Sequence, residues 1–314
     1  MPEISVVIPL YNKGPYIARA LNSVLTQTFQ DFEVIVVNDG STDEGAEVVR
    51  GFHDPRIRLI QQENRGVSAA RNRGVEDSRA ELIAFLDADD EWFPGHLETI
   101  LRLRNNFPEG GAYATRHQIY SPDGKIRSAK YYAIPPEPWE GIIPEYFLTV
   151  ALGDVPACSS TVVIPKKVFQ EIGGFVTGER WGEDIDVWGR IALRYPIVFS
   201  WDLGAKCYHD ADNRSNHIFA LQEQPFVKRA RTFIKNGIVS GKCKEYVNEY
   251  VVRLEIDRAS LNLILGNSEN ARQILSPLQT KLFRKRKIFW YVLTIMPPGL
   301  FHFILKAKRY IIEK

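Results

Sequence analysis

Short apolar runs alternate with segments of helical spacing over the first 90 residues of the chain. Four runs rich in β-branched side chains predict strands at residues 4–10, 32–38, 57–62 and 81–86. Between these runs, residues 14–28, 42–52 and 68–78 show the apolar spacing of helices. The runs are apolar on both faces, as is typical of strands covered by helices on each side. The pattern therefore predicts an α/β domain with a mostly parallel, twisted sheet.

The pattern becomes less regular after these units. A proline-rich stretch, "IPPEPWEGIIP" at residues 134–144, predicts a loop, and shorter apolar runs follow at residues 161–165, 197–201 and 205–208. From about Ser215 the chain turns helical, with one apolar stripe between Val247 and Leu265 and then "LGNSENARQILSPL", which indicates a turn into a second, antiparallel helix. We expect three parts: an α/β domain (residues 1–215), a helical hairpin extension (216–280) and a basic, apolar tail (281–314).

Polar residues follow three of the predicted strands at their C-terminal ends. They are Pro9–Asn12, Asn38–Asp43 and Asp87–Asp90. Because ligands bind beyond the carboxyl ends of the strands in open α/β sheets, we expect these clusters to share one crevice. In the second cluster Gly40 fits a turn, and Ser41 or Thr42 is the expected cap of the helix that follows.

Three carboxylates, Asp87, Asp89 and Asp90, fall within four positions of the third cluster, where like charges repel. A hard divalent cation such as Mg²⁺ or Mn²⁺ would resolve this repulsion, because it takes oxygen ligands from proteins and from phosphates. A solvated acidic turn before the helix near Pro94 accounts for the cluster equally well. The cluster alone does not decide between a metal site and such a turn.

Five motifs occur together in a fixed order along the chain. They are "SVVIPLYNK", "VIVVNDGSTD", "ENRGVSAARNRG", "FLDADD" and "WGEDIDVWGRI". In combination they resemble the family-2 glycosyltransferases, and the resemblance covers about residues 3–215. It implies the GT-A fold, here a mostly parallel twisted sheet with helices on both faces followed by a C-terminal helical extension. It also implies transfer of a sugar from a nucleotide-diphosphate donor with inversion at the anomeric carbon.

The resemblance assigns residues to the donor side of the site. Nucleotide contacts are implied for Pro9, Tyr11, Asn12, Asp39, Arg71 and Asp87, with Asp39 at the base and Asp87 at the ribose. Asp89 is the implied ligand of a divalent cation, Mn²⁺ or Mg²⁺, and His209 is implied to join it. The chain departs from the family at Asn38, where many relatives have Asp, and beside His209, where relatives often have Arg.

The resemblance also implies an acceptor side, with Asp184 as the catalytic base and Trp181 and Glu183 as acceptor contacts. An inverting transfer needs a carboxylate or histidine within reach of the acceptor hydroxyl. Asp184 precedes the amphipathic segment 185–193, so we expect it in the first turn of a helix, where the dipole keeps it ionised. The simpler interpretations are acids at a helix start for "GEDID", a core position for Trp181 and a polar strand end for His209.

Other enzyme classes fit the motifs less well. A dinucleotide-dependent oxidoreductase needs G-x-G-x-x-G after the first strand, and a sugar-nucleotide pyrophosphorylase needs a glycine-rich loop there, whereas the chain offers only Gly14. A glycoside hydrolase could pair Asp89 with Asp184, but the nucleotide motifs would then be unused. A binding module without activity would be expected to have lost one of these two aspartates.

Processive synthases of the family carry Q-x-x-R-W and membrane spans, and neither is found in this sequence. We therefore expect transfer of a single hexosyl or N-acetylhexosaminyl group, with a UDP-sugar as the expected donor. The expected acceptor is a hydroxyl of a glycan or lipid-linked molecule, in the synthesis of cell-envelope polysaccharide or glycolipid.

Charge is distributed unevenly along the chain, although the net charge is only +2. Residues 281–314 carry a net +8, which leaves −6 for the rest. A basic, apolar tail suggests an anionic surface as partner, and nucleic acid is disfavoured because apolar residues outnumber charges there. Residues 288–305 would form a helix about 27 Å long, but Pro297, Pro298 and Gly299 should break it.

The preferred interpretation of the tail is a pair of short segments in the membrane interface, with Trp290 and Tyr291 at headgroup depth. The alternative is a final helical pair packed on the protein body. The N-terminus shows no secretory signal, and the three cysteines lack the spacing of a zinc site or disulfide framework. We therefore expect a cytoplasmic protein, peripheral on the cytoplasmic face of the membrane.

Overall fold

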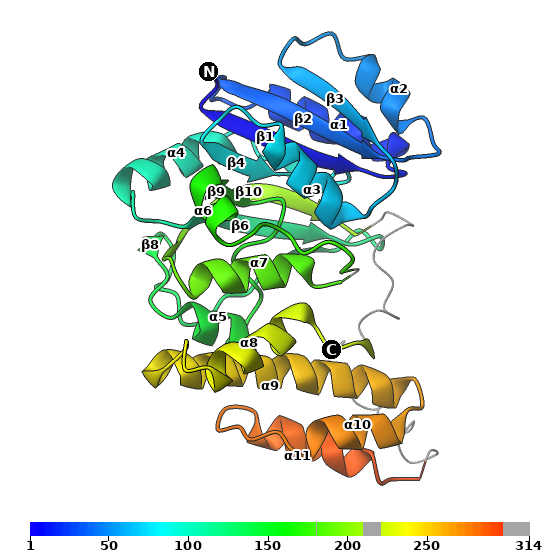
Figure 1. The fold of residues 1–314 in the computed structure, drawn as a ribbon, viewed down its shortest axis with the longest axis vertical. Helices are drawn as coiled ribbons and strands as arrows, with labels where there is room; N and C mark the ends of the chain where they lie inside the picture. The colour runs from blue at the N-terminus through cyan, green and yellow to red at the C-terminus, as the bar shows by residue number, and fades with distance from the viewer. Residues whose placement is uncertain (180, 210–220, 298–314) are drawn as a thin grey trace. The chain divides into compact units, whose positions relative to one another are not determined.

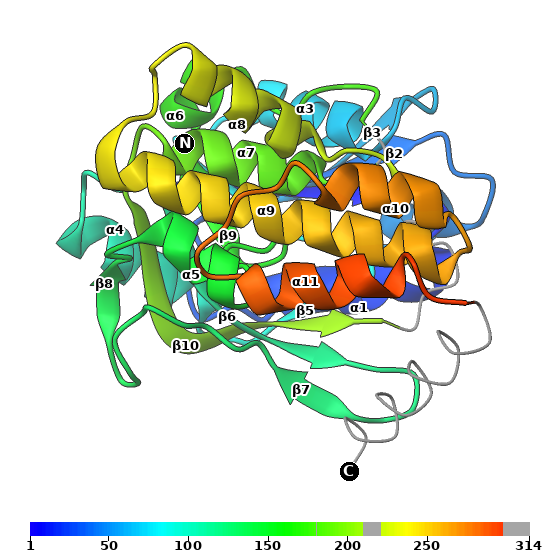
Figure 2. The ribbon, with the colours of Figure 1, turned by 90° about the horizontal axis from the view of Figure 1, so that it is seen from below.

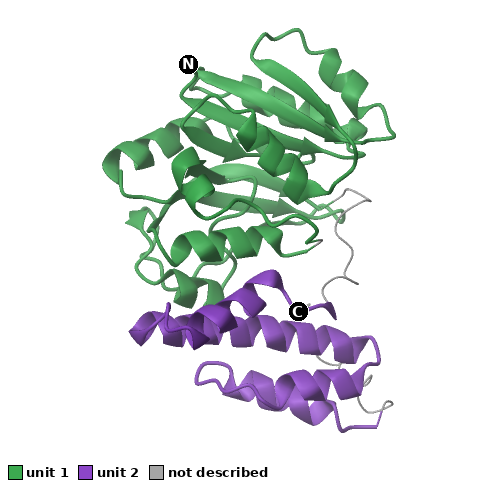
Figure 3. Cartoon of the chain, in the orientation of Figure 1, with its two compact units in different colours: residues 1–215 green, residues 216–314 purple. Residues whose placement is uncertain are grey.

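The computed structural model describes residues 1–179, 181–209 and 221–297. The chain divides into two compact units, residues 1–215 and 216–314 (Figure 3). The first unit is built on a twisted sheet with helices on both faces, and the described part of the second is helical (Figure 1).

Ten strands of the described residues form one sheet in the first unit. They are β1 (Ile4–Leu10), β2 (Phe32–Asp39), β3 (Ile57–Gln62), β4 (Leu82–Phe85), β5 (Glu91–Trp92), β6 (Ala112–Tyr120), β7 (Ile126–Ser128), β8 (Glu140–Ile142), β9 (Val162–Pro165) and β10 (Ile197–Tyr208). The order is β3-β2-β1-β4-β9-β6-β10-β5, with β7 paired to β6 and β8 to β10. Strands β3, β2, β1 and β4 are parallel, so their C-terminal ends lie at one edge.

Seven helices belong to the described part of this unit. They are α1 (Gly14–Leu25), α2 (Gly45–Arg50), α3 (Val67–Glu76), α4 (His96–Asn106), α5 (Tyr146–Leu152), α6 (Lys166–Glu171) and α7 (Glu183–Ala192). Alternate residues of β2 point to opposite faces of the sheet. Val34 and Val36 belong to the core that includes residues of α1 and α4. Ile35 and Val37 pack with Ala70 of α3 on the other face. Gly74 lets α3 approach the sheet closely, because a β-carbon there would lie 2.3 Å from Val7 Cγ1.

The predicted first four strands and three helices are present; the strands at residues 4–10 and 57–62 have the predicted ends, and the other elements differ by one to three residues. The largest difference is in the second half of the sheet, where the two runs at residues 197–201 and 205–208 form the single strand β10. The predicted loop at residues 134–144 contains the short strand β8. The prediction that Ser41 or Thr42 caps the next helix is wrong. Helix α2 begins at Gly45, and the N–H of Gly45 donates to Asp43 Oδ1 at 3.1 Å.

The described part of the second unit comprises α8 (Pro225–Lys235), α9 (Gly241–Ile264), α10 (Ser268–Leu275) and α11 (Arg284–Leu293). Helices α9, α10 and α11 pack around one apolar core that includes Ile256, Leu275 and Trp290 (Figure 2). No helix in the described ranges combines the length and the apolar character that crossing a membrane requires.

The tail prediction is corrected at one residue. Trp290 is 8% exposed and lies in the core of the second unit, so it does not sit at headgroup depth; its ring packs edge-on against Phe289. Helix α11 ends at Leu293, ahead of Pro297, as expected from the proline-rich break. The predicted second segment, beyond Pro297, lies outside the described residues.

Candidate active site

A buried arginine connects the two acidic motifs of the sequence. Arg71 lies in α3, and its guanidinium donates from Nη2 to Asp87 Oδ1 at 2.8 Å and from Nη1 to Glu183 Oε1 at 2.9 Å. Its side chain is 4% exposed, and the two carboxylates raise its pKa against the opposing effect of burial. The arginine therefore holds the loop after β4 and the start of α7 together.

Phe175 and Asn72 hold the start of α7 close to Arg71 and the loop after β4. The amide of Asn72 exchanges two hydrogen bonds with the backbone of Phe175, at 2.8 and 2.9 Å. The Phe175 ring then packs edge-on against Phe85 at 5.5 Å and against Trp188 of α7 at 6.1 Å. These contacts join β4, α3 and α7 behind the acidic residues, because each ring offers a large apolar surface to the others.

The third carboxylate of the loop after β4, Asp90, fixes this loop to neighbouring segments. It is buried, and it accepts hydrogen bonds from the Ser160 hydroxyl at 2.5 Å and from the Tyr208 N–H at 2.9 Å. Ser160 Oγ also accepts the N–H of Asp87 at 3.2 Å. Burial and the charges of Asp87 and Asp89 raise the pKa of Asp90. The loop is thus fastened to the segment before β9 and to the end of β10.

Asp89 faces a positive charge from the first strand end. Lys13, just after β1, places Nζ 2.7 Å from Asp89 Oδ2, and both side chains are 13% exposed. Arg19 of α1 donates to the carbonyl oxygen of Asp89 at 2.5 Å and lies over the Tyr208 ring. The carboxylate therefore already binds a cationic group, and its oxygens are of the type that Mg²⁺ and Mn²⁺ prefer. This donor chemistry fits the divalent cation that the resemblance implies.

The predicted partner of Asp89, His209, follows β10 directly and is exposed, with its N–H bonded to the Tyr120 carbonyl at 2.8 Å. The N–H of its neighbour Tyr208 bonds Asp90. This contact places the histidine backbone beside the acidic loop, which is the segment Asp87–Asp90. Within the described ranges, Asp89 and His209 do not form a cluster with a third metal-binding side chain. The roles of both residues stay predictions.

The predicted nucleoside side is held by a network between two strand ends. Asn12 adopts a φ of 50°, accepts the Thr42 N–H at 2.8 Å and donates its own N–H to Ser41 Oγ at 3.1 Å. Asp39 accepts hydrogen bonds from Gln62, Arg65 and Gly66 at 2.6, 2.9 and 2.8 Å. Pro9 is the penultimate residue of β1, which ends next to this network, and Tyr11 is exposed at its rim. Asp39 thus retains limited capacity to accept a further donor.

Asp184 occupies the first turn of α7, the predicted place, but in a different electrostatic state. Burial raises the pKa of Asp184 to about 7, the charge of Glu183 adds to the rise, and Arg71 opposes it. The prediction that the helix dipole keeps this carboxyl ionised is therefore wrong, because desolvation and a neighbouring carboxylate outweigh the dipole. A pKa near the working pH is what a general base needs.

The other acid of this motif, Asp186, has a structural partner. It is 1% exposed, and its carboxylate accepts from Arg190 Nε at 2.8 Å. Arg190 also bonds the carbonyls of Ile172 and Gly174, so the pair fixes α7 to the preceding turn. Asp184 is the more accessible acid. Trp181 is partly exposed, one residue before Gly182, which has a φ of 74°.

Comparison with known proteins supports the sequence-based assignment. A family model described as "Glycosyl transferase family 2" matches residues 5–173. The "Uncharacterized glycosyltransferase YibD" of Escherichia coli K12 is 43% identical over 103 residues, which are 32% of this chain and 30% of that protein. An "Uncharacterized glycosyltransferase" of Rickettsia felis is 31% identical over 231 residues, 71% of this chain and 37% of its own length. The matches thus span about a third of these relatives.

A solved structure confirms the fold class. The crystal structure of Staphylococcus aureus TarS 1–349 in complex with UDP-GlcNAc superposes with a TM-score of 0.66 at 16% identity, over 94% of this chain and 90% of that one. At this identity the likeness establishes the fold and leaves the site to be argued from its own residues.

Proposed function

Because the chain belongs to glycosyltransferase family 2, we propose that it is an inverting, metal-dependent glycosyltransferase that adds one sugar from a nucleotide-diphosphate donor to a hydroxyl acceptor. The observation that carries the proposal is the Arg71 bridge, which joins Asp87 on the donor side to Glu183, the neighbour of the proposed base. A UDP-sugar is the proposed donor, supported by the UDP-GlcNAc bound to the structurally similar TarS.

The proposed reaction divides the work between the two sides of the site. The acceptor hydroxyl oxygen attacks the anomeric carbon, the bond from that carbon to the diphosphate oxygen breaks, and the hydroxyl proton passes to Asp184. Arg71 keeps Asp87 in place for the ribose, and Asp39 would contact the base. Asp89 and His209 would hold a divalent cation, which offsets the charge that builds on the leaving diphosphate. Trp181 and Glu183 would border the acceptor.

Release of nucleoside diphosphate tests the proposal directly. The full chain is incubated with UDP-, GDP- or dTDP-sugars and Mn²⁺ or Mg²⁺, and the released diphosphate is measured with and without candidate acceptors. We expect one nucleotide to raise the melting temperature, because a ligand at 100 times its Kd stabilises the native state by about 2.7 kcal/mol. Absence of both binding and release with every nucleotide would contradict the proposal.

The pH dependence of the reaction should report Asp184. The deprotonated carboxylate is the active form, so kcat/KM should rise with pH through about 7, where burial and Glu183 have moved its pKa. Glu183→Gln removes the neighbouring negative charge, which lowers the pKa of Asp184 and shifts the rising limb to lower pH. Glu76→Gln, at an exposed position of α3, should leave it unchanged. A profile that is flat from about pH 6 to 8 would remove Asp184 as the titrating base.

For the tail, we propose peripheral attachment to an anionic membrane, which would bring the enzyme to lipid-linked acceptors of the cell envelope. Trp290 and Leu293 of α11 face the core, while Ile288 and Ile295 are 51% and 61% exposed. Val292 is exposed on the same side as Ile288, one turn later. Arg284, Lys285 and Arg286 are exposed at the start of the helix. An apolar stripe beside clustered basic residues is the pattern of a helix in the membrane interface.

Flotation with vesicles tests this attachment. Deleting the tail would remove Trp290 and Leu293 from the core, so point variants are preferable. Arg284→Gln with Lys285→Gln should weaken binding to vesicles that contain phosphatidylglycerol by about 2 kcal/mol, or roughly 30-fold. Lys125→Gln with Lys167→Gln, at two exposed lysines of the first unit, is the charge-matched control. Equal recovery of parent and double variant with the vesicles would contradict a role for these charges.

A further inference from the structure

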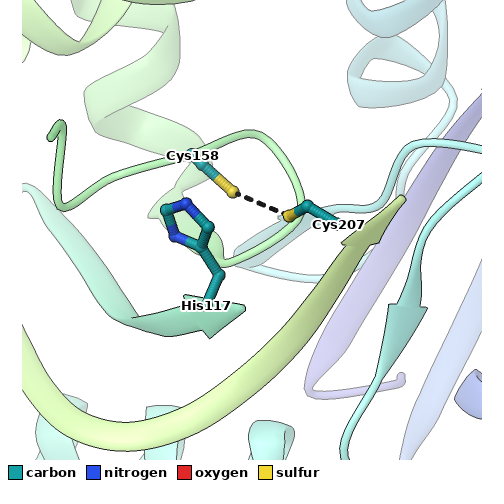
Figure 4. A group of neighbouring side chains, drawn as sticks. All are labelled: His117, Cys158 and Cys207. Carbon is teal, nitrogen blue, oxygen red and sulfur yellow. Dashed lines mark hydrogen bonds between the residues drawn. The ribbon is translucent and has the colours of Figure 1, made fainter. Parts of the chain in front are cut away.

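Three side chains that are far apart in the sequence meet beside the acidic loop. They are His117 of β6, Cys158 in the segment before β9 and Cys207 near the end of β10 (Figure 4). One donor atom from each lies within 4.8 Å of the others, and the two sulfurs are 3.7 Å apart. The cysteines lack the spacing of a zinc site along the sequence, but the fold brings two of them together with a histidine.

The distance between the sulfurs fits metal binding. A tetrahedral zinc ion with Zn–S bonds of about 2.3 Å holds two thiolates about 3.8 Å apart. A disulfide requires about 2.05 Å. The imidazole of His117 lies beside both sulfurs, so the three side chains surround one point (Figure 4).

The surroundings of His117 resemble those of a metal-bound histidine. The ring is 7% exposed, and its Nδ1 hydrogen-bonds with the Tyr131 hydroxyl at 3.2 Å. That bond leaves Nε2 as the nitrogen available to a ligand, and histidines that bind metals almost always have such a partner on the other nitrogen. The Tyr131 ring is itself held by Phe199 and Trp201, at 5.1 and 5.6 Å between centroids.

We propose that His117, Cys158 and Cys207 bind one zinc ion, with a fourth position for water. Two thiolates and an imidazole suit zinc, whereas Mg²⁺ and Mn²⁺ prefer oxygen ligands such as those of Asp89. The two sites therefore select different ions.

The proposed ion has a structural consequence for the donor side. Cys158 lies two residues before Ser160, whose hydroxyl bonds Asp90 and the N–H of Asp87. Cys207 directly precedes Tyr208, whose N–H bonds the other oxygen of Asp90. A zinc ion would join the two segments that fasten the acidic loop, and so stabilise the position of Asp87 and Asp89.

Metal content and cobalt spectroscopy on the full chain test the proposal. The reduced protein is loaded with Zn²⁺, desalted and analysed, and a second sample is loaded with Co²⁺. We expect about one equivalent of tightly bound zinc and a thiolate-to-cobalt charge-transfer band. Cys158→Ser and Cys207→Ser should lose both signals, while Cys243→Ser, at the exposed third cysteine, and Asp89→Asn should retain them. Tyr131→Phe should weaken zinc binding by roughly 10–100-fold.

Alkylation of the parent protein keeps the test decisive if a cysteine variant fails to fold. Bound zinc should protect Cys158 and Cys207 from a thiol reagent, as measured by peptide mass spectrometry, and leave Cys243 reactive. Loss of the cobalt band in Asp89→Asn, equal alkylation of Cys158 and Cys207 with and without zinc, or a parent protein that retains no zinc would each overturn the proposal.

Discussion

Asp184→Asn is expected to lower kcat by about 10²–10⁴-fold, the contribution typical of a general base. The amide keeps the size of the carboxyl and its place at the start of α7, but it cannot take the proton of the acceptor hydroxyl. Nucleotide affinity should stay near that of the parent, because Asp87 and Asp39 keep their partners. Calorimetry with the nucleoside diphosphate and initial rates of sugar transfer measure the two quantities separately.

Asp186→Asn is the control variant, because it makes the same substitution at the other acid of the motif, which has a structural partner. It removes a charge from a buried pair with Arg190, and we expect a loss of stability of about 3–5 kcal/mol. Asp184→Asn should instead retain the melting temperature of the parent or exceed it, because its carboxyl is charged at a cost. Transfer at the parent rate by Asp184→Asn would show that another residue is the base.

Asp89→Asn should weaken metal-dependent nucleotide binding by about 100-fold, which corresponds to roughly 2.8 kcal/mol. The amide cannot supply the charged oxygen that a divalent cation prefers, so the variant would hold the cation, and with it the nucleotide, less tightly. Titration of the nucleotide with and without Mn²⁺ measures the effect. Unchanged affinity that still depends on the metal would exclude Asp89 as a ligand.

Lys13→Ala is the informative partner variant, because Lys13 neutralises Asp89 in the structure. If the ammonium and the metal ion compete for this carboxylate, the variant should bind Mn²⁺ more tightly in the absence of nucleotide. Weaker metal binding in Lys13→Ala would mean that the lysine organises the site.

Local patterns were sufficient to predict the first half of the fold. Runs such as residues 4–10 and 57–62 are strands with the predicted ends, because each is a short apolar run between polar turns. The second half depends on longer-range pairing. Residues 197–208 form one strand although polar residues interrupt the pattern, since β6 pairs along its length through two register shifts.

The position of a motif was predictable where it lies at a strand end, as for Asp39 and the acidic loop, while the roles of these residues stay predictions. The electrostatics of the site could not be predicted from the sequence, because the charge of Asp184 depends on burial and on the neighbouring charges of Glu183 and Arg71, which only the fold brings close. The same holds for the ion pair between Lys13 and Asp89 and for the meeting of Cys158 with Cys207. Spacing along a chain carries no signal for partners that come from segments far apart in the sequence.

The two-sided contact of Arg71 has a consequence for the design of hybrid enzymes. Residues 67–90 contribute the arginine and Asp87, and residues 172–190 contribute Glu183 and the Phe175 ring that packs on both α7 and β4. A hybrid that takes these segments from different parents would leave a buried guanidinium facing mismatched partners. Donor and acceptor preferences should therefore be exchanged with both segments together, as a single module.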